Sequence, residues 1–407
     1  MSTNNFSNPN TKINRRTVLK GGLLATLGAG LFPASAAETM ASASPKGAVS
    51  LREKFFGCVT GVYLGSAMGA PVENYSWQKI EQQYGTLDRL LSYQHYYNGW
   101  DREPGTTEDG VERQKLMITA MIEKQDRVSA EDVRRIWVRD IKPESAGMVS
   151  EPFEGVLLAM AKTSMPATDI GRYCDYSGLV SMARSCHPIG LINAGDVPSA
   201  IQDVHEVGQL YNTADSRGIR WAEVTVVGIA AATRPNATVD DVMAAIFDNC
   251  DKGDGKSRQP VGVLKELQRG LDATAQCRDF RQMREKFDTL YSGEAAPYRF
   301  SYANEVVTKA VCIFKMVKGN TWEAMKASVN MGRDTDCLTA VAAGLSGALS
   351  GALDIPPGLI QQVDKATALN RYTNSQLTLR QTSDALFAAY KARLKHLRAY
   401  VEGMDAA

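Results

Sequence analysis

The sequence predicts an all-α fold in one large domain. Apolar residues recur at three- and four-residue spacing through the middle of the chain, and the alternating pattern typical of strands is nearly absent. Helix start signals agree with this spacing, since Ser129 stands three residues before Asp132, an arrangement that caps helices. The predicted helices of this region cover residues 130–141, 153–162, 199–211, 220–232, 239–250, 261–275, 304–317 and 322–329.

The first helix along the chain is predicted by its glycines. They recur every four residues, at positions 57, 61, 65 and 69. This spacing places them on one helical face, where they permit a second helix to approach closely. Pro71 ends the run and Glu73 follows it. A carboxylate at this point is placed to reach a buried site, although the spacing alone favours the surface.

The next predicted helix begins at an acidic turn. Thr107, Glu108 and Asp109 precede an amphipathic helix predicted over residues 111–124. Taken alone, this turn is more simply interpreted as a solvated helix N-cap, because Thr and Asp are preferred there.

A second acidic turn contains Asp334, Asp336 and Cys337 and opens a helix of small and apolar residues over 338–353. This apolar run is shorter than the ~20 residues that span a membrane, so we interpret it as a buried helix. Ionised carboxylates that crowd together in an apolar stretch are unstable unless a positive charge compensates them. A hard cation such as Mg²⁺ would supply that charge. Two acidic turns more than 200 residues apart can contribute oxygens to one site, which favours a single domain although 407 residues allow two or three.

Four segments, in this order, resemble motifs of the ADP-ribosylglycohydrolase family. They are the glycine-rich block 57–73, the acidic turn 107–109, the stretch 183–191 and the block 332–336. The resemblance implies a single large orthogonal helical bundle over residues 51–407. It also implies two divalent cations, usually Mg²⁺ or Mn²⁺, and hydrolysis of a bond at the anomeric carbon of ribose.

Position by position, the resemblance also implies the residues of the site. The metal ligands would be Thr107, Glu108, Asp109, Asp334, Asp336 and Cys337, and the catalytic residues would be Glu73, Asp109 and Asp334. Glu73 would serve as a general base or hold the substrate.

Five positions depart from the usual family pattern. The family usually has aspartate where this chain has Ser66 and Glu108, and threonine where it has Gly110. It usually has glycine at the position of Arg333 and a ligating threonine at the position of Cys337. The position of Cys337 at a helix N-terminus favours a thiolate, and a thiolate would favour softer ions than Mg²⁺. The alternative is that Cys337 only packs and that water takes its ligand position.

We therefore expect a metal-dependent hydrolase of an ADP-ribosyl or related glycosyl bond, acting on a small-molecule glycoside or an ADP-ribosyl substrate. The departures at Ser66 and Cys337 motivate an alternative, a non-catalytic ligand-binding member of the same fold with a partly degenerate metal site. Tyr96, Tyr97 and Trp100 precede the first acidic turn, where they either form a wall for a base or sugar ring or pack within their loop.

Composition excludes several other classes. The net charge is +1, so no basic footprint for nucleic acid is present. Seven cysteines lack the C-x-x-C spacing of zinc ribbons and thioredoxin-like sites. His187 lies in a Cys-His-Pro turn and is more simply a core or pocket-wall residue than a metal ligand.

The N-terminus predicts export. Arg15 and Arg16 precede an apolar stretch and an Ala-Ser-Ala cleavage site. We predict a twin-arginine signal peptide over residues 1–36 and a linker over 37–50, which makes the protein periplasmic or secreted and a client of the twin-arginine export machinery. The apolar stretch is too short to span a bilayer, so no stable membrane insertion of the mature chain is expected. ADP-ribosylated proteins are mainly cytosolic, so an exported member would act on another ribosyl compound or glycoside.

Overall fold

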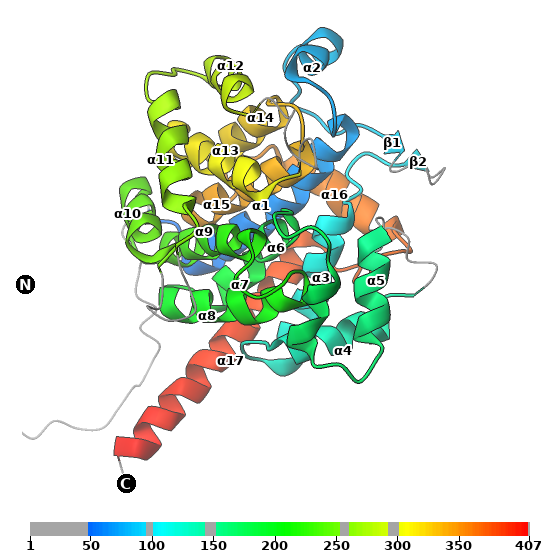
Figure 1. The fold of residues 1–407 in the computed structure, drawn as a ribbon, viewed down its shortest axis with the longest axis vertical. Helices are drawn as coiled ribbons and strands as arrows, with labels where there is room; N and C mark the ends of the chain where they lie inside the picture. Colours follow the sequence, from blue (N-terminus) through cyan, green and yellow to red (C-terminus); the bar gives the residue numbers. More distant parts are fainter. Residues whose placement is uncertain (1–47, 95–100, 143–151, 253–259, 292–300, 406–407) are drawn as a thin grey trace, which may run out of the picture. The chain divides into compact units, whose positions relative to one another are not determined.

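Helices make up nearly all the regular structure in the computed structural model, which describes residues 48–94, 101–142, 152–252, 260–291 and 301–405. The sheet found within these ranges is one antiparallel pair of two-residue strands, β1 (Tyr93–Gln94) and β2 (Asp101–Arg102). The predicted all-α fold is confirmed (Figure 1). Residues Lys46–Ala407 form one compact unit.

The helices agree with the sequence pattern in most of the chain. Each helix predicted for the middle region is present within a few residues of its expected bounds, while α2, α6, α7, α12 and α16 are absent from the predicted set. The α-helices of the described residues are α1 (Leu51–Gly69), α2 (Trp77–Tyr84), α3 (Asp109–Lys124), α4 (Ala130–Asp140), α5 (Pro152–Ala161), α6 (Ser181–Ser185), α7 (His187–Ile192), α8 (Val197–Val207), α9 (Arg217–Ala232), α10 (Val239–Asn249), α11 (Val263–Thr274), α12 (Phe280–Leu290), α13 (Ala303–Met316), α14 (Thr321–Val329), α15 (Thr335–Ser350), α16 (Pro357–Leu369) and α17 (Leu379–Asp405). Short 3-10 helices are η1 (Ala70–Val72), η2 (Ala167–Tyr173) and η3 (Gly208–Leu210).

Helices α1 and α15 lie side by side at the centre of the fold, with their backbones in contact (Figure 1). A Cβ atom added at Gly61 would lie 2.3 Å from the carbonyl oxygen of Ala343, and one added at Gly347 would lie 2.1 Å from the carbonyl oxygen of Gly57. Real Cβ atoms do not approach oxygen so closely, so only glycine fits. The close helix contact predicted from the four-residue glycine spacing is confirmed.

The same contact places the end of α1 beside the start of α15. A Cβ atom added at Gly69 would lie 2.4 Å from the Cα atom of Asp336. After η1 the chain pairs with the residues that precede α15, and the amide of Asn74 donates to the carbonyl oxygen of Arg333 at 2.9 Å. These contacts fix Glu73 beside the first turn of α15.

One helix of the described residues, Leu51–Val72, is long and apolar enough to cross a membrane by length and composition. Its apolar window is 94% buried inside the fold. Its main packing partners are α15 and α17, so here it serves as the central core helix.

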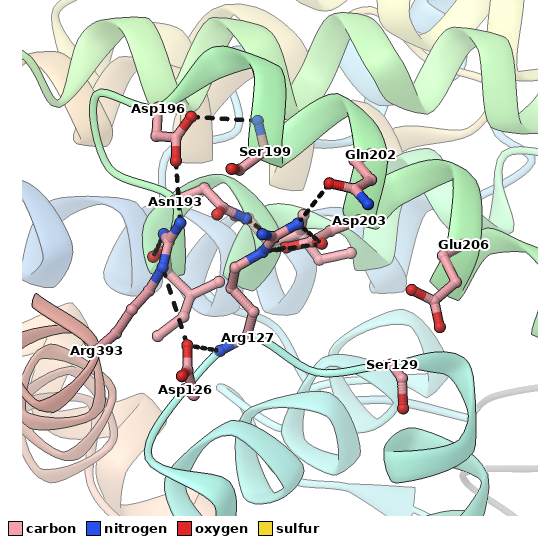
Figure 2. Close-up of polar contacts among 12 residues, drawn as sticks. Asp126, Arg127, Ser129, Asn193, Asp196, Ser199, Gln202, Asp203, Glu206 and Arg393 are labelled. Carbon is pink, nitrogen blue, oxygen red and sulfur yellow. Dashed lines mark hydrogen bonds and ion pairs between the residues drawn. The ribbon is translucent and has the colours of Figure 1, made fainter. Parts of the chain in front are cut away.

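Helix α17 packs on the body through its first half and leaves it at Arg393. Arg393 donates to the carbonyl oxygen of Ile192 at 2.6 Å and to Asp196 at 2.9 Å. Figure 2 shows Arg393 between Asp196, at the start of α8, and Asp126, in the loop between α3 and α4. Beyond Arg393 no residue of α17 up to position 405 is buried, so this polar cluster is where the helix separates from the body.

Candidate metal centre and active site

Three possible metal ligands gather in the first turn of α15. One donor atom from each of Asp334, Asp336 and Cys337 lies within 4.8 Å of the others, and all three side chains are buried. Asp334 is the N-cap of α15, and its Oδ1 accepts a hydrogen bond from the amide of Cys337 at 3.3 Å. Gly332 makes the preceding turn possible, because its φ is +73° and a Cβ atom there would lie 2.5 Å from the amide nitrogen of Trp77.

Each of the two carboxylates in this cluster has a buried oxygen atom that accepts no hydrogen bond. Oδ2 of Asp334 and Oδ1 of Asp336 are buried and have no hydrogen-bond partner. Burial raises the pKa of Asp336 well above its usual value, and the charge of Asp334 raises it further. Burial also raises the pKa of Asp334. Ionised carboxylates without partners cost free energy in the interior, and a cation between them would offset that cost. These residues therefore fit a hard divalent cation.

Glu73 faces the same cluster. Its side chain is half-buried. Burial, followed by the charges of Asp336 and Asp334, raises the pKa of Glu73 well above its usual value. The backbone pairing after η1 brings it here, so its place differs from the surface position that spacing alone favours. A carboxyl group with a raised pKa beside a cation site is suited to accept or donate a proton in catalysis.

Glu108 is the N-cap of α3 and is held from two directions. Its Oε1 accepts hydrogen bonds from the amide of Gly110 at 3.1 Å and from the hydroxyl of Ser66 at 3.2 Å. Ser66 and Glu108 both stand where the resemblance implies aspartate, and this hydrogen bond joins the two altered positions. The pair has one carboxylate, that of Glu108, where the resemblance implies two.

Arg184, at the end of α6, holds the carboxylate of Asp109 with two hydrogen bonds. Its Nη1 lies 3.1 Å from Oδ1 and its Nη2 lies 2.5 Å from Oδ2. The same Nη1 lies 3.4 Å from Sγ of Cys337 and 3.8 Å from Oε2 of Glu108. Gly110 makes room for this side chain, because an added Cβ atom would lie 2.9 Å from its Cδ. Sequence reasoning assigned no role to Arg184, although this residue lies within the family-like stretch 183–191, which is the signal that could have pointed to it.

Thr107 takes part in a buried charge pair. Its hydroxyl donates to Oε1 of Glu112 at 2.9 Å, and Lys115 donates to the same oxygen at 2.8 Å. Thr107 and Glu112 line a cavity of about 350 Å³, whose wall also includes Arg371 and Tyr372. The Thr107 hydroxyl thus bonds to Glu112 and Lys115, and neither of these residues belongs to α15.

The surroundings of Cys337 favour its thiol form in the absence of a metal. Burial, together with the charges of Asp334 and Asp336, raises its pKa well above the usual value. These effects outweigh the helix dipole, so the thiolate expected from the helix position is not favoured without a metal. The thiol donates to Oδ2 of Asp336 at 3.5 Å, and a cation that used this sulfur would have to displace its proton.

The other residues singled out in the sequence either make contacts outside the cluster or lie outside the described residues. His187 is buried, and burial lowers its pKa to about 3, so it is a neutral core residue. Arg333 pairs with Glu305, at 2.6 Å and 2.8 Å from its two oxygens, and this contact accommodates the charged side chain in place of a glycine. Tyr96, Tyr97 and Trp100 lie outside the described residues.

Comparison with known proteins identifies the family. The family model described as ADP-ribosylglycohydrolase matches residues 48–392, which is most of the chain and includes both acidic turns. The chain belongs to the ADP-ribosylglycohydrolase family. Members of this family are generally hydrolases.

Similar proteins match this chain over nearly their whole length. The uncharacterized protein YegU of Escherichia coli (strain K12) is 21% identical over 356 residues, which cover 82% of this chain and 99% of the relative. An uncharacterized protein of Archaeoglobus fulgidus is 23% identical over 325 residues, covering 74% of this chain and 90% of the relative. A solved ADP-ribosylglycohydrolase-related protein complex superposes with a TM-score of 0.59 at 15% identity, covering 84% of this chain and 99% of that one. The names of these relatives give no substrate for this member of the family.

Proposed function

We propose that the protein is a metal-dependent hydrolase that cleaves a ribosyl or related glycosyl bond in an ADP-ribosyl compound or another small glycoside. One observation carries the proposal: Asp334 and Asp336 are buried with unpartnered oxygens, and Glu73 faces them. A cation site beside a proton-transfer group meets the needs of metal-assisted attack by water at an anomeric carbon. Membership of the family supports this reaction class.

We propose Mg²⁺ or Mn²⁺ as the metal, held by Asp334 and Asp336 with Glu108 and Asp109 as further carboxylates. A donor set made mainly of oxygen suits these hard ions. When bound, the metal supplies Lewis-acid polarisation and lowers the pKa of a bound water. The resemblance implies two cations, and that number requires Asp109 to share its oxygens between a metal and Arg184.

The residues of the chain have separate tasks in this proposal. Glu73 holds or moves the proton, because burial and the charges of Asp336 and Asp334 raise its pKa and so favour its protonated form more than in a free glutamate. Arg184 fixes the direction of Asp109 through two hydrogen bonds. Burial of the α15 carboxylates keeps bulk water from solvating them, which strengthens every electrostatic contact in the site.

The ion pair between Arg184 and Asp109 also supports a second candidate function, a non-catalytic ligand-binding member of the fold. Both oxygens of Asp109 already have a cationic partner, so one of the expected metal positions is compensated by the protein itself. In this case the site would retain ligand affinity while turnover is lost.

Metal analysis combined with a substrate screen distinguishes these functions. The full chain is equilibrated with Mg²⁺ or Mn²⁺, its bound metal is counted, and it is assayed with ADP-ribosyl-arginine, ADP-ribosyl-serine, nucleosides and simple glycosides. The hydrolase proposal expects stoichiometric metal and a turnover that is lost in Asp334→Asn, a variant that keeps the N-cap. The exposed carboxylate of Asp240 provides the control, since Asp240→Asn should change neither. Absence of bound metal, with ligand binding but no turnover, would support the second function.

Replacing Cys337 with threonine is expected to shift metal preference toward Mg²⁺. Its sulfur belongs to the donor cluster of α15, and a hydroxyl is a harder ligand than a thiol. We expect the affinity for Mg²⁺ relative to Zn²⁺ to rise roughly tenfold in Cys337→Thr, as measured by competition calorimetry. An unchanged ratio would remove Cys337 from the ligand set.

We propose that residues 1–36 direct export through the twin-arginine pathway to the periplasm or beyond. The paired change Arg15→Lys and Arg16→Lys keeps the charge, yet it is expected to retain the precursor in the cytoplasm, because the arginine pair is read as an address. Cell fractionation measures this. Lys20→Arg should be exported normally, and export of the double variant at the parent rate would contradict the assignment.

A further inference from the structure

The last turns of α17 carry an apolar stripe outside the body of the fold. Leu397, Tyr400, Val401 and Met404 are 48%, 67%, 54% and 60% exposed. They are four of the ten exposed large apolar side chains among the described residues, so exposed apolar surface is concentrated here. Spacings of three, one and three residues place all four on one face of the helix.

This stripe continues the face of α17 that is buried in its first half. The buried positions recur with the same three- and four-residue spacing and end with Leu386, Ala389, Tyr390 and Arg393. Arg393 is the residue anchored to the body in Figure 2. One helical face is therefore apolar on both sides of this anchor, while the described body covers only the part before it. A continuous packing face that extends past its own domain is typical of a surface that another molecule covers.

The charges of the segment favour a second copy of the same helix in antiparallel orientation. Basic residues come first and acidic residues last, in the order Lys391, Lys395, Arg398, Glu402 and Asp405. At 100° per residue these five side chains lie on the same side of the apolar stripe. In a parallel twofold pair the charged sides of the two helices would lie on opposite sides of the seam, so these charges would not meet. Antiparallel helices would place the acidic end of each beside the basic stretch of the other.

We propose that this segment of α17 is a self-association surface, through which two copies of the chain pair as antiparallel helices about a twofold axis. The axis would pass between Tyr400 and Val401, so that Leu397 of one copy meets Met404 of the other. Arg398 of each copy then comes within reach of Asp405 of the other. A pairing of this kind is self-complementary and closed, so it stops at two copies.

The stripe is short, so the association belongs to the class of small, weak interfaces and is tested at about 10–100 μM protein. Sedimentation equilibrium of the full chain should show a mass that rises from 44.3 kDa toward twice that value. Leu397→Asp inserts a charge in the apolar seam of both copies and should weaken the association by roughly 100-fold or more. Leu353→Asp is the matched control, because Leu353 is 86% exposed at another place on the fold and should leave the association unchanged.

Exchange of charges tests the antiparallel orientation. Asp405→Arg alone and Arg398→Asp alone should each weaken the association several-fold, because each creates two repulsive pairs per dimer. The double variant with both changes should recover the parent affinity. A chain that stays monomeric at every concentration overturns the proposal, and so does a dimer unaffected by Leu397→Asp. Failure of the double variant to recover overturns the antiparallel arrangement.

Discussion

Replacing Asp336 with asparagine is expected to stabilise the metal-free protein and to abolish its stabilisation by Mg²⁺. Asp336 is buried, one of its oxygens has no hydrogen-bond partner, and the charge of Asp334 adds to the cost of ionising it. Asparagine removes the charge and offers an amide to the neighbouring carboxylate. We expect the metal-free unfolding free energy to rise by about 1–3 kcal/mol, the range for relieving a buried unsatisfied group.

The sign of the pH dependence follows from the raised pKa of Asp336. The folded state binds this proton more tightly than the unfolded chain, whose aspartate has a pKa near 3.9. The stability that the protonated group contributes is complete below about pH 4 and is lost as the pH rises through the raised folded value. The advantage of Asp336→Asn should therefore grow as the pH rises above about 4 and then level off.

Denaturant unfolding in chelator and in excess Mg²⁺, at several pH values, measures both effects. Bound metal stabilises the parent by mass action, and the variant should lose this gain because its Mg²⁺ affinity falls by more than about 100-fold. Asp240→Asn should behave like the parent in both conditions. Equal Mg²⁺ stabilisation of Asp336→Asn and the parent would remove the α15 carboxylates from the proposed metal centre.

A methyl group at position 347 is expected to be the most destabilising small change in the core. A Cβ atom there would lie 2.1 Å from the carbonyl oxygen of Gly57, and both atoms belong to the backbone contact of α1 with α15. Helix propensity favours alanine over glycine by only about 1 kcal/mol. Overpacking typically costs about 1–3 kcal/mol, and the upper end applies here because the opposing atom belongs to the backbone and cannot move aside. We therefore expect a large net loss of unfolding free energy in Gly347→Ala.

Separation of α1 from α15 should also disturb the candidate metal centre, because the end of α1 lies beside the α15 carboxylates. Mg²⁺ affinity is a second readout for Gly347→Ala, and we expect it to fall. Gly358→Ala in α16 is the matched control, because an added Cβ atom there meets nothing within 4 Å. That control should lose no stability. A Gly347→Ala protein as stable as the parent would show that the helices separate at little cost.

The fold was largely predictable because its signals are local. The glycines at every fourth position of α1 specify a helix with one bare face, and the small residues of α15 supply the face that fits it. Helices α6 and α7 are short, and α7 begins with His187 and Pro188, so neither leaves a long periodic pattern. The local pattern does not determine which helices pack against one another.

The candidate site was predictable at the level of residues but less so in their contacts. Asp334 and Asp336 stand out because two carboxylates in an apolar context are unusual. The place of Glu73 depends on backbone pairing with Arg333, which is distant in the sequence. The role of Arg184 depends on the space left by Gly110, and a side chain that is absent gives no pattern to read.

The burial of α1 against α15 imposes an order on the folding of the chain. The main packing partners of α1 are α15 and α17, and 266 positions separate Gly69 from Thr335, where α15 begins. Contacts that close such long loops form late. Until then, an unfinished chain carries a free helix as apolar as a membrane span, and such exposed surface invites aggregation or capture by the bilayer. If the export route proposed for residues 1–36 takes up the chain only after it has folded, α1 is covered before the chain meets a membrane.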